Sequence, residues 1–116
     1  MSWRRGDILI TGSSVRIGDG DVEFPLAVID AVSLRNGLIV VLMDPSAGPP
    51  HSGQFRNLVA IDVEGVITST AETPATDVLG SYNEIVSSDP LMADAPSYRC
   101  EIDVATGQII KATYYK

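Results

Sequence analysis

Hydrophobic and polar positions along this chain alternate over short stretches that turn residues interrupt, which is the pattern of β-strands. Residues 7–10 form the first stretch, and residues 15–17 and 22–24 flank the turn-rich sequence Gly18-Asp19-Gly20-Asp21. No segment keeps the 3.6-residue period of a helix over ten or more positions. The pattern therefore predicts strands and little helix.

The strongest hairpin signal is Asn36-Gly37, which lies between the apolar stretches 28–34 and 38–43. Asn-Gly is the preferred pair of a two-residue hairpin turn in which both residues hold positive φ. The stretch 38–43 lacks polar alternation and is β-branched in its centre, so we expect a central strand covered on both faces.

The remainder of the chain continues the β pattern. After a proline-rich loop at 44–53, the predicted strands are 55–63, 66–71, 82–86 and 90–93, with an irregular stretch at 73–79. A closing hairpin joins 98–104 to 108–115 through Ala105-Thr106-Gly107. A chain of 116 residues fits one core. We therefore expect a single all-β domain over residues 1–116, with eight to nine strands.

Two of these hairpins resemble each other and a known repeat. Asp62 and Asp103 are 41 positions apart, which is close to the roughly 40–45 residues of a propeller blade. Ala60-Ile61-Asp62 with Gly65, and Ile102-Asp103 with Thr106-Gly107, resemble the quinoprotein-type β-propeller repeat, which carries an Ala-Leu/Ile-Asp, turn, Thr-Gly and Trp pattern.

The resemblance concerns local shape, since the family tryptophan would fall at Ser69 and Lys111 and is absent from both. It implies an aspartate that starts each turn by accepting hydrogen bonds from later amides, and a glycine that supplies positive φ. Two blades cannot close a propeller, and the resemblance implies no cofactor. We expect an open twisted antiparallel sheet or a small sandwich that carries two propeller-blade-like hairpins.

The net charge of −7 is concentrated in one segment. Nine of the fifteen acids lie between residues 62 and 103, where Arg99 is the only base. Such a field repels nucleic acid and attracts a basic protein partner, although acidity also serves solubility alone. The candidate partner-binding residues are Asp62, Glu64, Glu72, Asp77, Glu84, Asp89 and Asp94, with Tyr82 as an aromatic anchor.

Candidates for catalysis or metal binding are few. Alternation places Cys100 on the face of Tyr98 and Ile102, as expected of a core residue, and its acidic neighbours raise the pKa of the thiol. With Cys100 and His51 as the only cysteine and histidine, the usual zinc ligand sets are disfavoured. The sequence Asp19-Gly20-Asp21-Val22-Glu23 lacks the full spacing of a calcium loop. We expect no catalytic residue, metal or cofactor.

Small size, concentrated acidity and the absence of catalytic motifs favour a non-catalytic binding protein. In size and charge the chain is similar to bacterial immunity-type inhibitors, so the concrete expectation is occlusion of a basic toxin or nuclease. The alternatives are a small β-fold enzyme or ligand-binding protein that uses a carboxylate pair, and a structural or assembly module that pairs through strand edges.

The expected location is the cytoplasm. The longest apolar run falls far short of the ~20 residues of a membrane helix, and no export signal follows the two arginines near the N-terminus. A lone cysteine allows no internal disulfide. The sequence leaves open the partner's identity, the oligomeric state, the strand order, and whether the acidic segment is a binding face.

Overall fold

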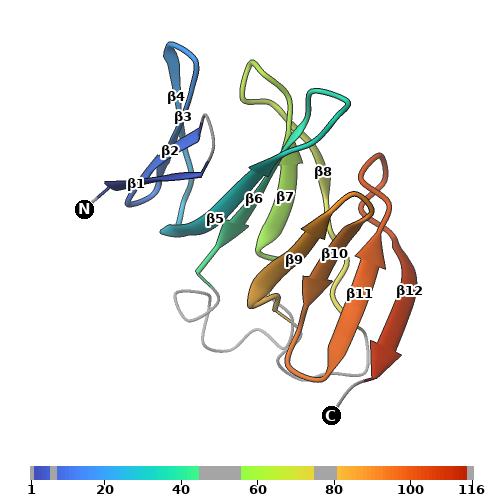
Figure 1. Cartoon of the computed structure of the whole chain (residues 1–116). Helices are drawn as coiled ribbons and strands as arrows, with labels where there is room; N and C mark the ends of the chain where they lie inside the picture. The colour runs from blue at the N-terminus through green and yellow to red at the C-terminus, as the bar shows by residue number, and fades with distance from the viewer. Residues whose placement is uncertain (1, 6–7, 45–55, 75–80, 115–116) are drawn as a thin grey trace.

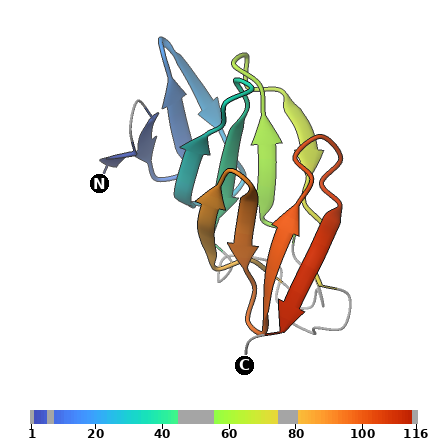
Figure 2. The same cartoon turned by 45° about the vertical axis from the view of Figure 1, so that its right-hand side comes forward.

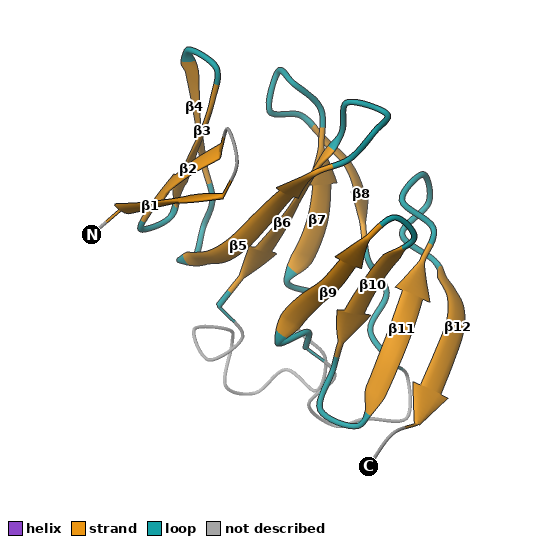
Figure 3. Ribbon diagram, in the orientation of Figure 1, coloured by secondary structure: helices purple, strands orange, loops and turns teal. Residues whose placement is uncertain are grey.

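The computed structural model of the chain describes residues 2–5, 8–44, 56–74 and 81–114, and within them it contains twelve strands and no helix (Figures 1 and 3). The strands form three four-stranded antiparallel sheets, each a meander in chain order. The expected all-β class is confirmed. The strand count and the arrangement differ from the prediction of eight to nine strands in one open sheet or a small sandwich. Nowhere in these ranges is there a helix with the length and apolar character needed to cross a membrane.

The three sheets follow one another along the sequence. The N-terminal sheet contains β1 (Ser2–Arg5), β2 (Ile8–Thr11), β3 (Ser14–Ile17) and β4 (Gly20–Glu23). The middle sheet contains β5 (Val28–Ser33), β6 (Ile39–Met43), β7 (Leu58–Ile61) and β8 (Ile67–Thr70). The C-terminal sheet contains β9 (Glu84–Ser88), β10 (Leu91–Asp94), β11 (Tyr98–Ile102) and β12 (Ile109–Tyr114).

The middle sheet lies between the other two and is covered on both faces (Figures 1 and 2). Every residue of β6 and β7 is buried, and successive side chains point to opposite faces. Val40 and Leu42 belong to the core shared with the C-terminal sheet, whereas Ile39 and Val41 belong to the core shared with the N-terminal sheet. The prediction that residues 38–43 form a central strand is confirmed.

The hairpin at Asn36-Gly37 forms as predicted, but its turn has a different conformation. Gly37 has a φ of +88°, and among the described residues only glycines have positive φ, so the expected positive φ of Asn36 is wrong. The Leu34 carbonyl accepts a hydrogen bond from the Gly37 N–H at 3.2 Å, and the Asn36 side chain accepts one from the Leu38 N–H at 3.0 Å. The loop thus has three residues and ends on its glycine, a geometry that leaves Asn36 at negative φ.

The aspartate-led turns form as the resemblance implied. The Asp62 carboxylate accepts hydrogen bonds from the N–H groups of Glu64 and Val66 at 2.9 and 3.0 Å, and Gly65 has a φ of +86°. The Asp103 carboxylate accepts one from Ala105 at 2.9 Å, in a turn that closes at Gly107. Both turns are therefore held by their own side chains.

Each of these two turns also packs against the last strand of the preceding sheet. A Cβ on Gly65 would lie 2.7 Å from a methyl group of Val22 in β4, and one on Gly107 would overlap the Thr70 carbonyl oxygen in β8. The Ser69 hydroxyl of β8 donates to the Val104 carbonyl at 2.7 Å. Adjacent sheets are thus joined through the same kind of turn-to-strand contact.

Candidate functional site

Among the described residues, five hairpin turns lie toward one end of the three sheets, those of β3–β4, β5–β6, β7–β8, β9–β10 and β11–β12 (Figures 1 and 2). In a four-stranded meander, the connections between the first and second strands and between the third and fourth strands fall at the same end of the sheet. We call this end the turn end; it comprises residues 18–19, 34–37, 62–65, 89–90 and 103–107.

The turn end gathers acidic side chains from all three sheets. Arg35 is the only basic residue among the residues that define it. The carboxylates of the turn end are those of Asp19, Asp62, Glu64, Asp89 and Asp103. The excess of negative charge creates a field that favours the approach of a cationic surface.

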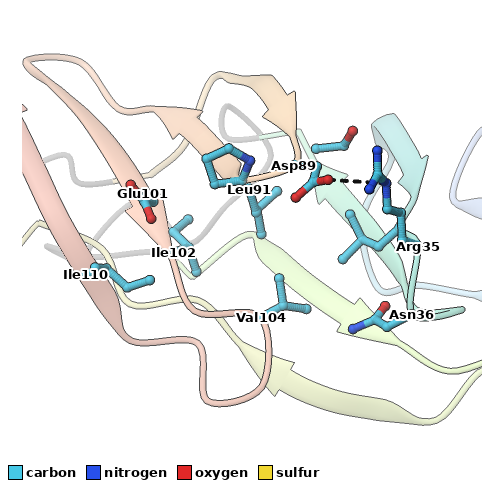
Figure 4. A pocket seen from close by; sticks show the side chains of 11 residues that line it. Arg35, Asn36, Asp89, Leu91, Glu101, Ile102, Val104 and Ile110 are labelled. Atoms are coloured by element: carbon cyan, nitrogen blue, oxygen red, sulfur yellow. Dashed lines mark ion pairs between the residues drawn. The ribbon is translucent and has the colours of Figure 1, made fainter.

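A groove of about 280 Å³ lies at this end, between the β5–β6 turn and the C-terminal sheet (Figure 4). Its lining residues are Leu34, Arg35, Asn36, Ser88, Asp89, Pro90, Leu91, Glu101, Ile102, Val104 and Ile110. Figure 4 shows the apolar side chains of Leu91, Ile102 and Val104 between Glu101 on one side and Arg35 on the other. The groove is thus apolar in its middle and charged on both sides.

Among the described residues, only one of the two carboxylates that line the groove forms an ion pair. The Arg35 guanidinium lies 3.3 Å from the Asp89 carboxylate, and the two side chains are 91% and 64% exposed. Such an exposed pair contributes little to stability. No ion pair reaches the half-buried Glu101 from any side chain in the described ranges, although Lys111 lies opposite it in the β11–β12 register. Within those ranges, one carboxylate of the groove therefore has no cation.

The predicted partner-binding residues do not form one face. Asp62, Glu64 and Asp89 lie at the turn end, and the Asp62 carboxylate is engaged by the backbone of its own turn. Glu84 and Asp94 lie opposite each other in the register of β9 and β10, at the end of these strands away from the turn end. Asp94 makes two contacts with Arg99, at 2.8 and 3.1 Å, and its side chain is 13% exposed.

Glu72 has a structural position that the sequence did not indicate. Its carboxylate accepts a hydrogen bond from the Ile109 N–H at 2.8 Å, its own N–H donates to the Gly107 carbonyl, and its carbonyl accepts the Tyr82 hydroxyl. The carboxylate thus helps to join the middle sheet to the C-terminal sheet. Asp77 and His51 lie outside the described residues.

The prediction of Tyr82 as an interface anchor is wrong. Its side chain is fully buried in the core between the middle and C-terminal sheets. The buried Asn57 accepts a hydrogen bond from the Tyr82 N–H at 2.9 Å and donates to the carbonyls of Tyr82 and Met43, each at 2.8 Å. Because the ring is packed and its polar groups are satisfied internally, no partner can reach it.

Three charged or polar residues of the groove, Arg35, Asn36 and Glu101, are absent from the predicted partner-binding residues. Asn36 was considered only as part of a hairpin turn. The available signal was topological. Because consecutive hairpins in a meander place alternate turns at one end, the order of the strands along the chain would have put the Asn36-Gly37 and Asp89-Pro90 turns at the same end of their sheets.

Cys100 and the Asp19–Glu23 segment show no arrangement suited to chemistry. Cys100 is buried as predicted, and burial raises the pKa of its thiol, which disfavours the reactive thiolate. Two hydrogen bonds from Arg16 hold Asp21 and lower the pKa of its carboxyl, and Glu23 accepts the Ser13 hydroxyl. In the part of the chain that is described, no three His, Cys, Asp or Glu side chains cluster as a metal site would require.

Comparison with known proteins gives one finding. Neither the curated proteins nor the solved structures contain a significant match to this chain. One family matches residues 6–114, which is nearly the whole chain. Its description is "Domain of unknown function (DUF7957)", and the chain belongs to this family.

Proposed function

We propose that this chain is a non-catalytic binding protein of the immunity-inhibitor type, whose turn end occludes a basic protein partner such as a toxin or nuclease. One observation carries the proposal: carboxylates from three separate sheets lie at the turn end, where Asp89 also lines a groove, and Arg35 is the only base among the residues that define this end. Electrostatic complementarity of this kind steers encounter and excludes partners of like charge.

The turn end also offers apolar contact area within its acidic surroundings. Val63 and Val66 of the β7–β8 turn are 68% and 56% exposed, on either side of Glu64 and Gly65. The bonds of Asp62 fix this turn before any partner arrives. A rigid surface loses less conformational entropy on binding than a flexible one, which supports a docking role.

The rival function is a ligand-binding protein or enzyme that uses a carboxylate pair. One observation favours it, because Asp89 and Glu101 line the same groove. Asp89, however, is largely exposed and already paired with Arg35, so the groove does not enclose two carboxylates around a shielded ligand. The rival predicts turnover or tight binding of a small cationic ligand, which calorimetry against small amines would detect.

A bacterial, cytoplasmic setting is part of the proposal. It rests on the sequence, in which Cys100 is the only cysteine, and on the likeness in size and charge to immunity-type inhibitors. The partner would meet the protein in that compartment or be neutralised there before export.

Affinity capture with matched variants tests the proposal. The bait is the full chain, and the test variant carries Glu64→Lys and Asp89→Lys at the turn end. The control is Glu84→Lys, an exposed acid at the opposite end of the C-terminal sheet. We expect the wild type and the control to retain a basic protein that the double variant loses. Retention of an acidic protein, or equal retention by all three baits, contradicts the proposal.

A further inference from the structure

We propose that Asn36 is a site of spontaneous modification, at which the side-chain amide is converted to a carboxylate without an enzyme. Asn36 and Gly37 belong to the exposed β5–β6 turn, and the chemistry of this pair plays no part in the binding role proposed above. The reaction consumes only water, so the inference stands independently of any partner.

The reaction joins two groups that are neighbours in the chain. Hydroxide removes the proton of the Gly37 N–H, and the nitrogen attacks the side-chain amide carbon of Asn36. A new N–C bond forms, and the amide nitrogen leaves as ammonia with a proton from water, which restores the hydroxide. Water then opens the resulting succinimide at either carbonyl. One opening gives aspartate, and the other gives isoaspartate, in which the main chain runs through the side-chain carbon of residue 36.

The turn leaves the attacking nitrogen accessible. Asn36 and Gly37 are both exposed, and a Cβ placed on Gly37 would meet no heavy atom of the described residues within 4 Å. Glycine has no side chain that could shield its own nitrogen. The hydrogen bond from the Gly37 N–H to the Leu34 carbonyl measures 3.2 Å, at the long end of the range for such bonds. It therefore restrains the nitrogen only weakly.

The turn also holds the side chain that is attacked. The Asn36 Oδ1 accepts a hydrogen bond from the Leu38 N–H at 3.0 Å. This bond closes a ring of atoms that contains both the Gly37 nitrogen and the side-chain amide carbon, so it keeps the two in the same small region. Its donor points at the oxygen on which negative charge develops during the attack, and it stabilises that charge.

The other two asparagines of the chain lack this combination. Asn57 is fully buried, and its side-chain nitrogen donates to the carbonyls of Met43 and Tyr82. Asn83 is exposed, but the next nitrogen belongs to Glu84, whose side chain crowds it and whose negative charge opposes the loss of its proton. Asn83 is therefore the internal control for exposure without an adjacent glycine.

The products change the charge of the turn end. Asn36 lines the groove together with Arg35 and Asp89 (Figure 4), so either product adds a carboxylate near their ion pair. Isoaspartate also lengthens the main chain of the loop by one carbon, which disturbs the hydrogen bonds that close it.

Peptide mapping by mass spectrometry tests the inference on the full folded chain, incubated at mildly alkaline pH. We expect the peptide that contains Asn36 to gain the mass difference between a hydroxyl and an amino group, and to separate into aspartate and isoaspartate forms. Asn57 and Asn83 keep their amides over the same period. Gly37→Ala slows the conversion by about tenfold or more, or about 1.4 kcal/mol in the barrier, because its methyl group hinders the nitrogen. Asn36→Gln keeps its amide, since the ring to be formed is one atom larger.

Two results would overturn the inference. Loss of the amide at Asn83 as fast as at Asn36 would show that the turn confers no preference. Retention of the amide at Asn36 in the folded chain would do so as well, and its loss from the same chain unfolded in urea would then identify the Leu34 hydrogen bond as the cause. Circular dichroism of the wild type and of both variants confirms that each is folded during the incubation.

Discussion

Gly37 and Gly107 share a backbone conformation but differ in what a side chain would meet. Their φ values are +88° and +80°, where an L-residue costs about 1–2 kcal/mol. A Cβ at Gly37 has no heavy atom within 4 Å, whereas one at Gly107 would overlap the Thr70 carbonyl oxygen. We predict that Gly37→Ala lowers the free energy of unfolding by about 1 kcal/mol and that Gly107→Ala lowers it by more than about 2 kcal/mol. Urea denaturation measures both, and equal losses would show that the turn does not pack against β8.

Because of Tyr82 and Cys100, we expect the free energy of unfolding to depend on pH in the alkaline range. Burial raises the pKa of both groups above their ordinary values of 10.0 and 9.0, so the folded state holds these protons more tightly than the unfolded state does. The unfolded state then binds fewer protons at high pH, and the free energy of unfolding decreases as pH rises. We predict a plateau below about pH 9 and a steady fall above it. The fall should be shallower in Tyr82→Phe, which lacks the buried hydroxyl. Identical slopes in the wild type and in Tyr82→Phe would contradict the burial of Tyr82.

At the scale of the element, the β7–β8 turn contains two carboxylates, of which one stabilises the turn and the other does not. Asp62 accepts two backbone hydrogen bonds, whereas Glu64 extends from the exposed tip. We predict that Asp62→Ala costs about 1 kcal/mol of stability, the usual net value of such bonds. Glu64→Ala should stay within about 0.5 kcal/mol, as surface changes do. Thermal unfolding of both variants tests this, and the reverse order of losses would remove the structural role given to Asp62.

Hairpins and strand faces were predictable because they depend on local chemistry. The Asn36-Gly37 turn, the aspartate-led turns, and the alternation that buries Cys100 and Ile102 all follow from neighbours in sequence. The conformation of Asn36 was not predictable, because Asn-Gly fits both a two-residue and a three-residue loop. The roles of Glu72 and Tyr82 were not predictable either, since their partners lie 37 and 25 positions away.

At the scale of the whole molecule, the period-2 pattern identifies which residues are buried but not where one sheet ends and the next begins. The N-terminal, middle and C-terminal sheets share their cores through β6 and β7, whose residues face both neighbours in turn. The acidic residues that were predicted to form a binding face do not lie on one surface. Glu84 and Asp94 lie at the end of the C-terminal sheet opposite to Asp89. A single domain over residues 1–116 stays a prediction.

The most direct test of the turn end as a binding surface is the association rate of the captured partner, measured at low and high salt. The screening length is about 10 Å at 0.1 M salt and about 3 Å at 1 M. We predict that the wild-type rate falls steeply with salt, and that Glu64→Lys with Asp89→Lys slows association at low salt by about tenfold or more. Glu84→Lys should associate at close to the wild-type rate. A rate that is indifferent to salt and to the turn-end reversals, or that falls as much in Glu84→Lys, would contradict the account.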